Sequence, residues 1–246
     1  GFILPPTSIS EVYEPATRFH PEKMTVAAGL LDLEVLSSLA ERLPLTPSQH
    51  KLLSDLAPRG QLEDFLVQWE GSYPDIQAYR VRGSFSGLGL QAQPARAARP
   101  RTATQLARTG VPAIPGFANL NGQIDANERA GKLSLASQNA VFHLPAYFAE
   151  SSLPVDRLDL QSHWEIQKND ILQFHIDRMN FSMQDMAGTL SGTHTLPLSG
   201  KSPGAIDMKA GLSRFDLSKL ARYLPLQTAR PASEWIAGAL MEGRAS

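Results

Sequence analysis

Between about Leu62 and Leu212 the chain alternates apolar with polar residues, and this alternation limits what it can fold into. Successive side chains of a strand point to opposite sides, so a period of two predicts strands with one apolar face. The segments RLDLQSHWEI (157–166) and AIDMKAGL (205–212) are clear examples. We therefore predict a mainly β fold of the α+β class, built from antiparallel strands.

Turn-forming pairs and two short helical stretches interrupt the alternation. The pairs are Asn121-Gly122, Asn169-Asp170, Ser199-Gly200 and Pro203-Gly204, and each is typical of a tight turn. Helical spacing of leucines and other apolar residues predicts short helices at about 47–57 and 232–242. The glycines of GSFSG (83–87) predict a bulge or tight curvature within a strand.

One string occurs twice in nearly the same form, as LAERLPL (39–45) and LARYLPL (220–226). Each copy follows an Asp-Leu pair, at Asp32 and Asp216, and precedes a proline, a stretch with helical spacing and a glycine. The distance between the copies is much longer than the repeats of about 20 to 50 residues that build solenoids. It suits a multi-strand module punctuated by one helical segment.

Composition excludes several classes of function. The 246 residues include 23 Lys and Arg against 24 Asp and Glu, so no overall field attracts the chain to nucleic acid or to a membrane surface. Cysteine is absent, which excludes disulfides and thiolate chemistry. The sequence shows neither a signal peptide nor an apolar run of the roughly 18 to 20 residues that a membrane-spanning helix needs. We expect a piece of a longer protein.

An arginine-rich stretch stands apart from this neutral background. No acidic residue occurs from Ile76 to Ile124, and the middle of this stretch has several prolines and no strand or helix period. We predict a long loop at about 91–115. A solvated insertion is one interpretation; the other is contact with anionic lipid headgroups or an acidic partner, worth about 1 kcal/mol per arginine near an anionic surface. The residues for such a contact are Arg96, Arg99, Arg101 and Arg108.

No motif in the chain carries catalytic chemistry. The six histidines show no metal-ligand spacing, and His163 and His175 alternate with their neighbours as structural residues of strands do. GLGLQA (87–92) leads into a proline-rich stretch instead of the helix that a dinucleotide phosphate requires. We therefore expect no enzyme, no catalytic residue, no metal and no cofactor.

Several longer strings, in their order, identify a family resemblance. They are LAPRGQLEDFLVQWEG (56–71), GSFSGLGL (83–90), PGFANLNGQIDANERAGKLSLAS (115–137), FHLPAYFAESSLPVDRLDLQSHWEI (142–166) and LARYLPL followed by EWIAGALMEGRA. With them the chain resembles the YhdP-like branch of the AsmA-like family, from about Leu30 to its end. It departs from that pattern mainly in the arginine-rich insertion after Leu90.

The resemblance implies an internal periplasmic segment of a long protein that an N-terminal helix anchors in the inner membrane of Gram-negative bacteria. It implies a repeating β-groove, made of strongly curved antiparallel sheets, with an apolar inner face along which phospholipid acyl chains move toward the outer membrane. Phospholipid is the expected partner, the membrane is reached through regions outside this segment, and nucleic acid is not expected. Protein partners in the envelope are not specified.

The doubled string then marks the boundaries of groove modules. We expect end strands of a preceding unit at 1–31, a helical boundary segment at 32–60, the main curved unit at 61–215, and a second, truncated boundary segment at 216–246. The predicted groove lining comes from the apolar positions of the alternating segments. These are Leu120, Ile124, Leu133, Leu135, Leu158, Leu160, Trp164, Ile166, Leu172, Phe174, Ile176, Ile206 and Met208.

Alternation identifies an apolar face but not what covers it. The same residues could form the dry core of a structural or scaffold module of an envelope protein that has no ligand. A hydrolase with an unrecognised site is a third hypothesis. The family resemblance favours the lipid-binding groove.

Overall fold

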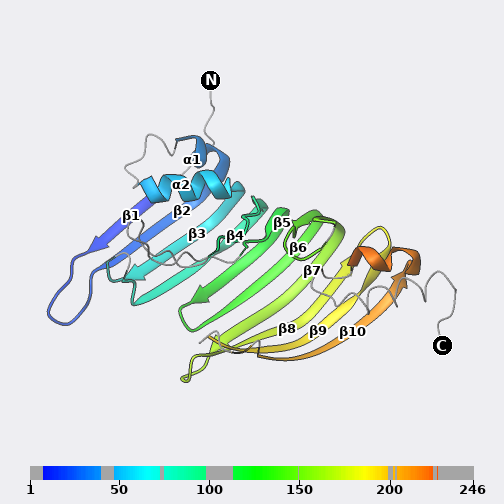
Figure 1. The fold of residues 1–246 in the computed structure, drawn as a ribbon. Helices are drawn as coiled ribbons and strands as arrows, with labels where there is room; N and C mark the ends of the chain where they lie inside the picture. The colour runs from blue at the N-terminus through cyan, green and yellow to red at the C-terminus, as the bar shows by residue number, and fades with distance from the viewer. Residues whose placement is uncertain are drawn as a thin grey trace, which may run out of the picture.

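Ten strands form one antiparallel sheet in which every strand pairs with its neighbours in the chain (Figure 1). The computed structural model describes residues 8–39, 47–72, 75–97, 113–148, 150–198, 202, 204–223 and 226. The strands are β1 (Ile9–Glu14), β2 (Lys23–Asp32), β3 (Arg59–Glu70), β4 (Ala78–Leu90), β5 (Gly116–Asn127), β6 (Ala130–His143), β7 (Ser152–Ile166), β8 (Ile171–Ser182), β9 (Met186–Pro197) and β10 (Ala205–Phe215).

The sheet is curved and open, with β1 and β10 as its two edge strands (Figure 1). This confirms the predicted mainly β fold with a curved antiparallel sheet. The strand β1 pairs with β2, and β2 pairs with β3, so the sheet continues across the module boundary expected at 32–60. The proposed division into modules stays a prediction.

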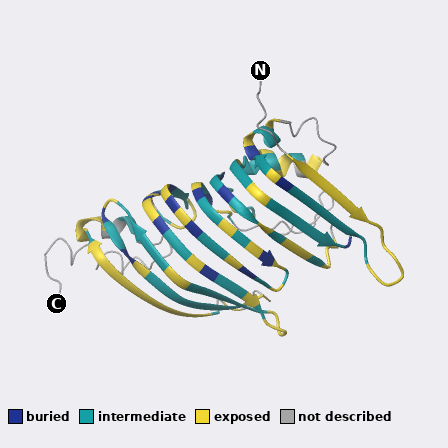
Figure 2. Cartoon of the chain, turned by 180° about the vertical axis from the view of Figure 1, so that it is seen from behind, coloured by how far each residue is buried: buried dark blue, intermediate teal, exposed yellow. Residues whose placement is uncertain are grey.

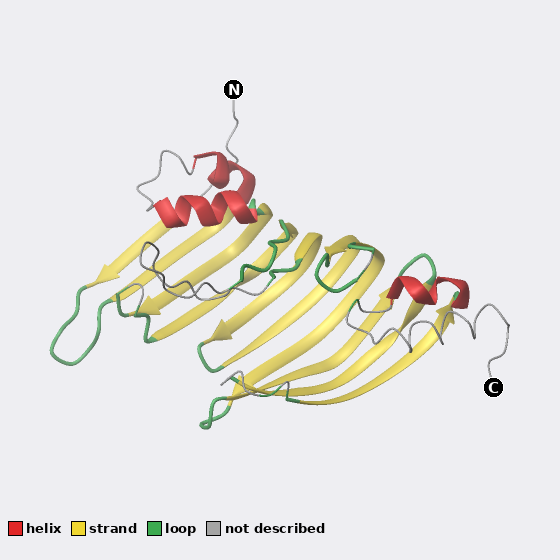
Figure 3. Cartoon of the chain, in the orientation of Figure 1, coloured by secondary structure: helices red, strands yellow, loops and turns green. Residues whose placement is uncertain are grey.

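The short helical segments follow even-numbered strands and lie at the same end of the strands, near the two edges of the sheet (Figure 3). Two are α-helices, α1 (Leu33–Leu39) and α2 (Pro47–Leu56), and one is a 3₁₀ helix, η2 (Leu217–Tyr223). The helix predicted at 47–57 is therefore confirmed, whereas the one predicted at 232–242 lies outside the described residues. Among the described elements, α1 is the helix with the most contacts to strands, namely to β2 and β3.

The repeated Asp-Leu pair is a helix cap in both copies. Asp32 ends β2, and its Oδ1 accepts hydrogen bonds from the backbone N–H groups of Glu34 and Val35, each at 3.0 Å. Asp216 follows β10, and its Oδ1 accepts from the backbone N–H of Ser218 at 3.0 Å. A helix start leaves several N–H groups without partners, and an aspartate side chain satisfies them. The Asp-Leu pair thus occurs twice because a strand leads into a capped helical segment twice.

A series of bulges crosses the middle strands. Gly87 in β4, Asn119 in β5 and Asn139 in β6 have φ angles of 60°, 60° and 53°. Glycine and asparagine tolerate this left-handed region better than other residues do. The register shifts between Phe85 and Leu88 confirm the bulge predicted for the glycines of 83–87. At each bulge two successive residues point to the same face of the sheet. The alternation therefore shifts by one residue, and the apolar residues before and after the bulge all point to the other face.

The predicted turn at Asn121-Gly122 is wrong, because both residues lie inside β5. The Asn121 side chain serves the bulge instead: its Oδ1 accepts a hydrogen bond from the Gly87 backbone N–H at 2.9 Å. The Asn119 side chain likewise donates to the Gln138 carbonyl at 2.8 Å. Asparagine therefore fits a bulged strand as well as a turn, since its side chain bonds to backbone groups that the bulge removes from the ladder.

The other predicted turns fall between strands or outside the described residues. Asn169-Asp170 connects β7 to β8, as predicted, and Asp170 has a φ of 56°. Ser199-Gly200 and Pro203 lie outside the described residues, between β9 and β10. The predicted arginine-rich loop connects β4 to β5, and 98–112 of it lies outside the described residues.

Candidate functional site

One face of the sheet is apolar across its strands, and we call it the apolar face. The register between neighbouring strands, with the bulges included, places large apolar side chains of β3 to β10 on this side. They are Leu62, Val67, Trp69, Val81, Phe85, Leu88, Phe117, Leu120, Ile124, Leu133, Leu135, Phe142, Leu158, Leu160, Trp164, Ile166, Leu172, Phe174, Ile176, Met179, Phe181, Leu190, Leu196, Ile206, Met208 and Leu212.

All the residues predicted to line a groove share this face. For example, Leu135 pairs with Leu160, Trp164 with Phe174, and Ile176 lies in register with Gly192 next to Met208. Sequence alternation therefore places these side chains together correctly. Their contact with lipid stays a prediction.

Burial varies along the apolar face. In the middle strands a core cluster contains Ala140, Val155 and Leu158, with exposed fractions of 0%, 2% and 3%. At the β10 edge, Ile206 is 67% exposed and Leu212 is 55% exposed. Figure 2 shows the same trend, with β1 and β10 exposed and buried positions on the strands between them. The apolar face is thus packed in its centre and open toward the β10 edge.

No second layer explains the burial in the centre. Among the described elements, α1 packs on β2 and β3 and η2 contacts the end of β10, and no helix makes comparable contacts with the middle strands. The buried side chains are therefore shielded mainly by their neighbours on the same face. Side chains crowd in this way on the concave side of a curved sheet, and we therefore infer that the apolar face is the inner side of the curve.

A close contact on β6 and β7 shows how tightly the inner side is filled. The Trp164 ring lies over Gly131 of the neighbouring strand, and a Cβ atom on Gly131 would lie 2.2 Å from Trp164 Cζ2. Only glycine therefore fits at this position. The indole ring spans the space above two strands and extends the apolar face without interruption.

The opposite side, which we call the polar face, carries charged and hydroxyl side chains. The His163 ring stacks on the His175 ring with centroids 4.5 Å apart. His163 Nδ1 contacts Asp177 Oδ2 at 2.9 Å, and His175 Nδ1 contacts Thr193 Oγ1 at 3.0 Å. Within the described residues, no group of three His, Asp or Glu side chains is placed to hold a metal ion.

The arginine candidates for headgroup contact have different outcomes. Arg96 forms an ion pair with Asp55 of α2, with 3.1 Å between Nη2 and Oδ2. This contact links the start of the loop to α2, where Asp55 also pairs with Lys51. Arg99, Arg101 and Arg108 lie outside the described residues, so their part in binding stays a prediction.

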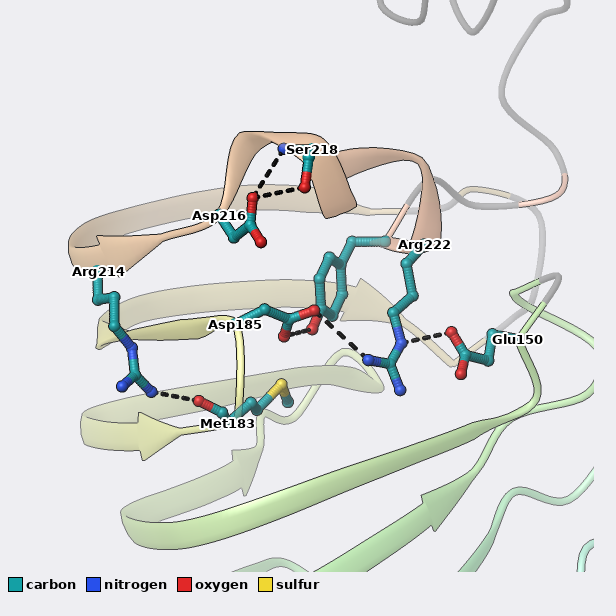
Figure 4. Close-up of polar contacts among 8 residues, drawn as sticks. Glu150, Met183, Asp185, Arg214, Asp216, Ser218 and Arg222 are labelled. Carbon is teal, nitrogen blue, oxygen red and sulfur yellow. Dashed lines mark hydrogen bonds and ion pairs between the residues drawn. The ribbon is translucent and has the colours of Figure 1, made fainter. Parts of the chain in front are cut away.

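A cluster of charged residues at the end of the sheet was not predicted from the sequence. It surrounds a cavity of about 630 Å³, which we call the end cavity, where the β8–β9 turn, the end of β10 and η2 meet (Figure 4). The lining residues are Glu150, Gln184, Asp185, Arg214, Phe215, Asp216, Ser218, Lys219 and Arg222.

Asp185 is the buried centre of this cluster. Its carboxylate accepts a hydrogen bond from the Tyr223 hydroxyl and contacts Arg222 Nη1 at 3.4 Å (Figure 4). Arg222 Nε also forms an ion pair with Glu150. The Tyr223 hydrogen bond lowers the pKa of Asp185 below its usual range, against the opposing effect of burial, and a backbone hydrogen bond at Asp185 and then the Arg222 charge add to the lowering. Burial and the Asp185 carboxylate raise the pKa of Tyr223 to about 12.

A family model described as "YhdP protein" matches residues 1–246. The chain belongs to the YhdP family. Searches of curated proteins and of solved structures found no match. The resemblance stated from the sequence strings is thereby confirmed.

The YhdP family is associated with the cell envelope and is not known as a family of enzymes. None of the described helices of this YhdP-family chain has the length and apolar character that crossing a membrane requires. Family membership does not name a ligand for the apolar face or for the end cavity, so their ligands have to be inferred from the chemistry of their side chains.

Proposed function

We propose that this chain binds phospholipid acyl chains along its apolar face. It acts as a periplasmic segment of an inner-membrane-anchored envelope protein that supports lipid transport to the outer membrane and the barrier function of that membrane. It performs no catalysis in this role. The observation that carries the proposal is a continuous apolar face with no second layer over it among the described elements.

Physical chemistry favours an apolar occupant for such a face. An exposed apolar surface of this extent promotes aggregation unless something apolar covers it. Each methylene group of an acyl chain that leaves water contributes about 0.8 kcal/mol. A flexible chain also adapts to an uneven surface, because it needs no directional hydrogen bonds. Transport further requires a continuous path, and the apolar side chains follow one another from strand to strand.

The openness of the face near β10 indicates where acyl chains have most room. Ile206 and Leu212 are more than half exposed, whereas Leu158 in the centre is almost fully buried. Lipid therefore contacts the β10 end most extensively and lies above the packed cluster in the middle strands.

A structural module with a dry core is the second candidate function. The core cluster favours it, because Phe85, Leu120 and Leu135 are buried by protein side chains alone. In this alternative the exposed residues at the edges bury themselves against neighbouring segments of a longer protein, and no lipid binds.

Lipid extraction combined with native mass spectrometry distinguishes the two candidates. The test variant carries Ile206→Asp and Leu212→Asp on the exposed part of the apolar face. Its control carries Ala205→Asp and Thr189→Asp, which add the same charge on the polar face, at nearby positions of β10 and β9. Leu160→Asp is avoided because Leu160 packs against the core cluster and its replacement would unfold the sheet.

Phospholipid that co-purifies with the wild type and the control, but not with the folded test variant, supports the proposal. Circular dichroism checks that each variant keeps its strands. Absence of phospholipid from all three folded proteins would instead favour the dry structural module.

A further inference from the structure

The end cavity contains cations and carboxylates in equal number, but they are not equally engaged. Its cations are Arg214, Lys219 and Arg222. Its carboxylates are Glu150, Asp185 and Asp216. The partners of each group, taken in turn, show which charges remain available to a ligand.

The three carboxylates already have partners within the protein. Asp185 accepts from the Tyr223 hydroxyl and pairs with Arg222. Glu150 pairs with Arg222 as well. Asp216 accepts from the Ser218 hydroxyl at 2.7 Å and from the Ser218 backbone N–H. These carboxylates therefore hold η2 against the sheet, and Arg222 is neutralised between two of them.

Within the described residues, two cations of the end cavity have no carboxylate partner. Arg214 donates one hydrogen bond, to the backbone carbonyl of Met183, and keeps the rest of its guanidinium N–H groups (Figure 4). Lys219 is exposed, and its ammonium forms no hydrogen bond or ion pair with the part of the chain that the structure describes. Both side chains line the same cavity. A guanidinium fork beside a free ammonium is suited to the several oxygens of a phosphate group.

The end cavity also adjoins apolar surface. Phe215 lines it and pairs with Met186, at the position where the apolar face reaches the end of β10. Met183, whose carbonyl holds Arg214, packs against the core cluster of the apolar face. A ligand with a phosphate in the cavity can thus continue along apolar side chains without a break.

We propose that the end cavity binds the phosphate of a phospholipid headgroup through Arg214 and Lys219, while the acyl chains of the same molecule lie on the apolar face beyond Phe215. This assignment rests on the proposed function, because it names a headgroup subsite for the same lipid. The cavity volume of about 630 Å³ falls within the range of about 300 to 1,000 Å³ that small-molecule sites occupy. The cavity fixes one end of the lipid, and the apolar face accepts tails without directional contacts.

Binding measurements on the full chain with three probes test the subsite. The probes are phosphatidylethanolamine, diacylglycerol with the same acyl chains, and inorganic phosphate. The test variant is Arg214→Gln with Lys219→Gln, which keeps polar side chains but removes both charges. The control is Arg178→Gln with Lys209→Gln, which removes two exposed cations outside the cavity.

The wild type and the control are expected to bind phosphatidylethanolamine about tenfold more tightly than diacylglycerol, the change that one or two charge-assisted hydrogen bonds produce. The test variant is expected to lose this preference and to bind diacylglycerol as before. An unchanged preference in the test variant overturns the subsite and leaves the proposed function standing. Failure of all proteins to bind either lipid overturns the proposed function. Inorganic phosphate binding that only the test variant loses, without lipid binding, overturns the lipid headgroup as the source of the phosphate.

Discussion

Asparagine side chains hold the bulges of the middle strands in place. Asn121 accepts from the Gly87 backbone N–H, and Asn119 donates to the Gln138 carbonyl. Backbone groups that leave the ladder need such partners, since an unpaired polar group in a protein interior costs about 1 to 3 kcal/mol. These side chains therefore contribute to the shape of the sheet through hydrogen bonds to its backbone.

We predict that Asn121→Ala lowers the free energy of unfolding by about 1 to 3 kcal/mol, because the Gly87 N–H loses its acceptor. Gln123→Ala is the matched control on the same strand, since Gln123 is exposed; its effect should stay within about 0.5 kcal/mol. Urea unfolding followed by circular dichroism measures both. Equal stabilities of the two variants would contradict the role assigned to Asn121.

The Asp185 carboxylate makes stability depend on acid pH. Its pKa is lower in the folded chain than its ordinary value, chiefly because of the Tyr223 hydroxyl. The stabilisation is therefore fully present above the unfolded-state pKa, about 3.9, and is lost as the pH falls through the lower pKa of the folded state.

We predict that Asp185→Asn destabilises the chain by about 1 to 3 kcal/mol at pH 7 and that the gap from the wild type shrinks below about pH 4. Denaturant unfolding at pH 7, 5 and 3 measures the gap. Asp156→Asn, at an exposed position of β7, serves as the control and should show a small, constant difference. A gap for Asp185→Asn that is equally wide at pH 3 would disagree with this explanation.

At the scale of elements, the junctions between strand and helix repeat the same solution. Asp32 caps α1 after β2, and Asp216 caps η2 after β10. At the first junction α1 packs on β2 and β3, so its formation and the strand pairing beneath it depend on each other.

We predict that Asp32→Ala costs about 0.5 to 2 kcal/mol, because the Glu34 and Val35 N–H groups lose their acceptor. Amide hydrogen exchange should become faster in α1, while β7 and β8 exchange as before. Asp207→Ala on the exposed polar side of β10 should change neither. Unaltered exchange in α1 would mean that the cap contributes nothing to its stability.

Strands were predictable from the sequence because their signal is local. The alternation in 157–166 and 205–212 identified both the strands and the side chains that share a face. The Asn121-Gly122 pair misled because asparagine side chains bond to backbone groups in bulges and turns alike, and only the neighbouring strand decides between them.

The end cavity gave no comparable signal. Asp185, Arg214 and Arg222 come from three separate stretches, and their contacts depend on how η2 packs against the β8–β9 turn. The available hints were an aspartate in a short hairpin connection and a second Asp-Leu pair followed by Arg222. Neither hint specifies a partner, so the cluster could be found only in three dimensions.

At the scale of the whole molecule, a ten-stranded meander gives one unbroken surface on each side. The bulges keep the apolar residues on the inner side even where the simple alternation fails. A sheet with this arrangement offers an acyl chain a path across successive strands, with a charged cavity at one end. The central claim is that lipid lies on the inner side only.

Photo-crosslinking along five successive residues of β8 tests that claim most directly. A photoreactive amino acid replaces Leu172, Gln173, Phe174, His175 or Ile176, one at a time, and the chain is irradiated with phospholipid present. Mass spectrometry then detects the lipid adduct. Adducts should form at positions 172, 174 and 176, which lie on the apolar face, and not at positions 173 and 175, which lie on the polar face. Equal adducts at all five positions, or none, would contradict the account.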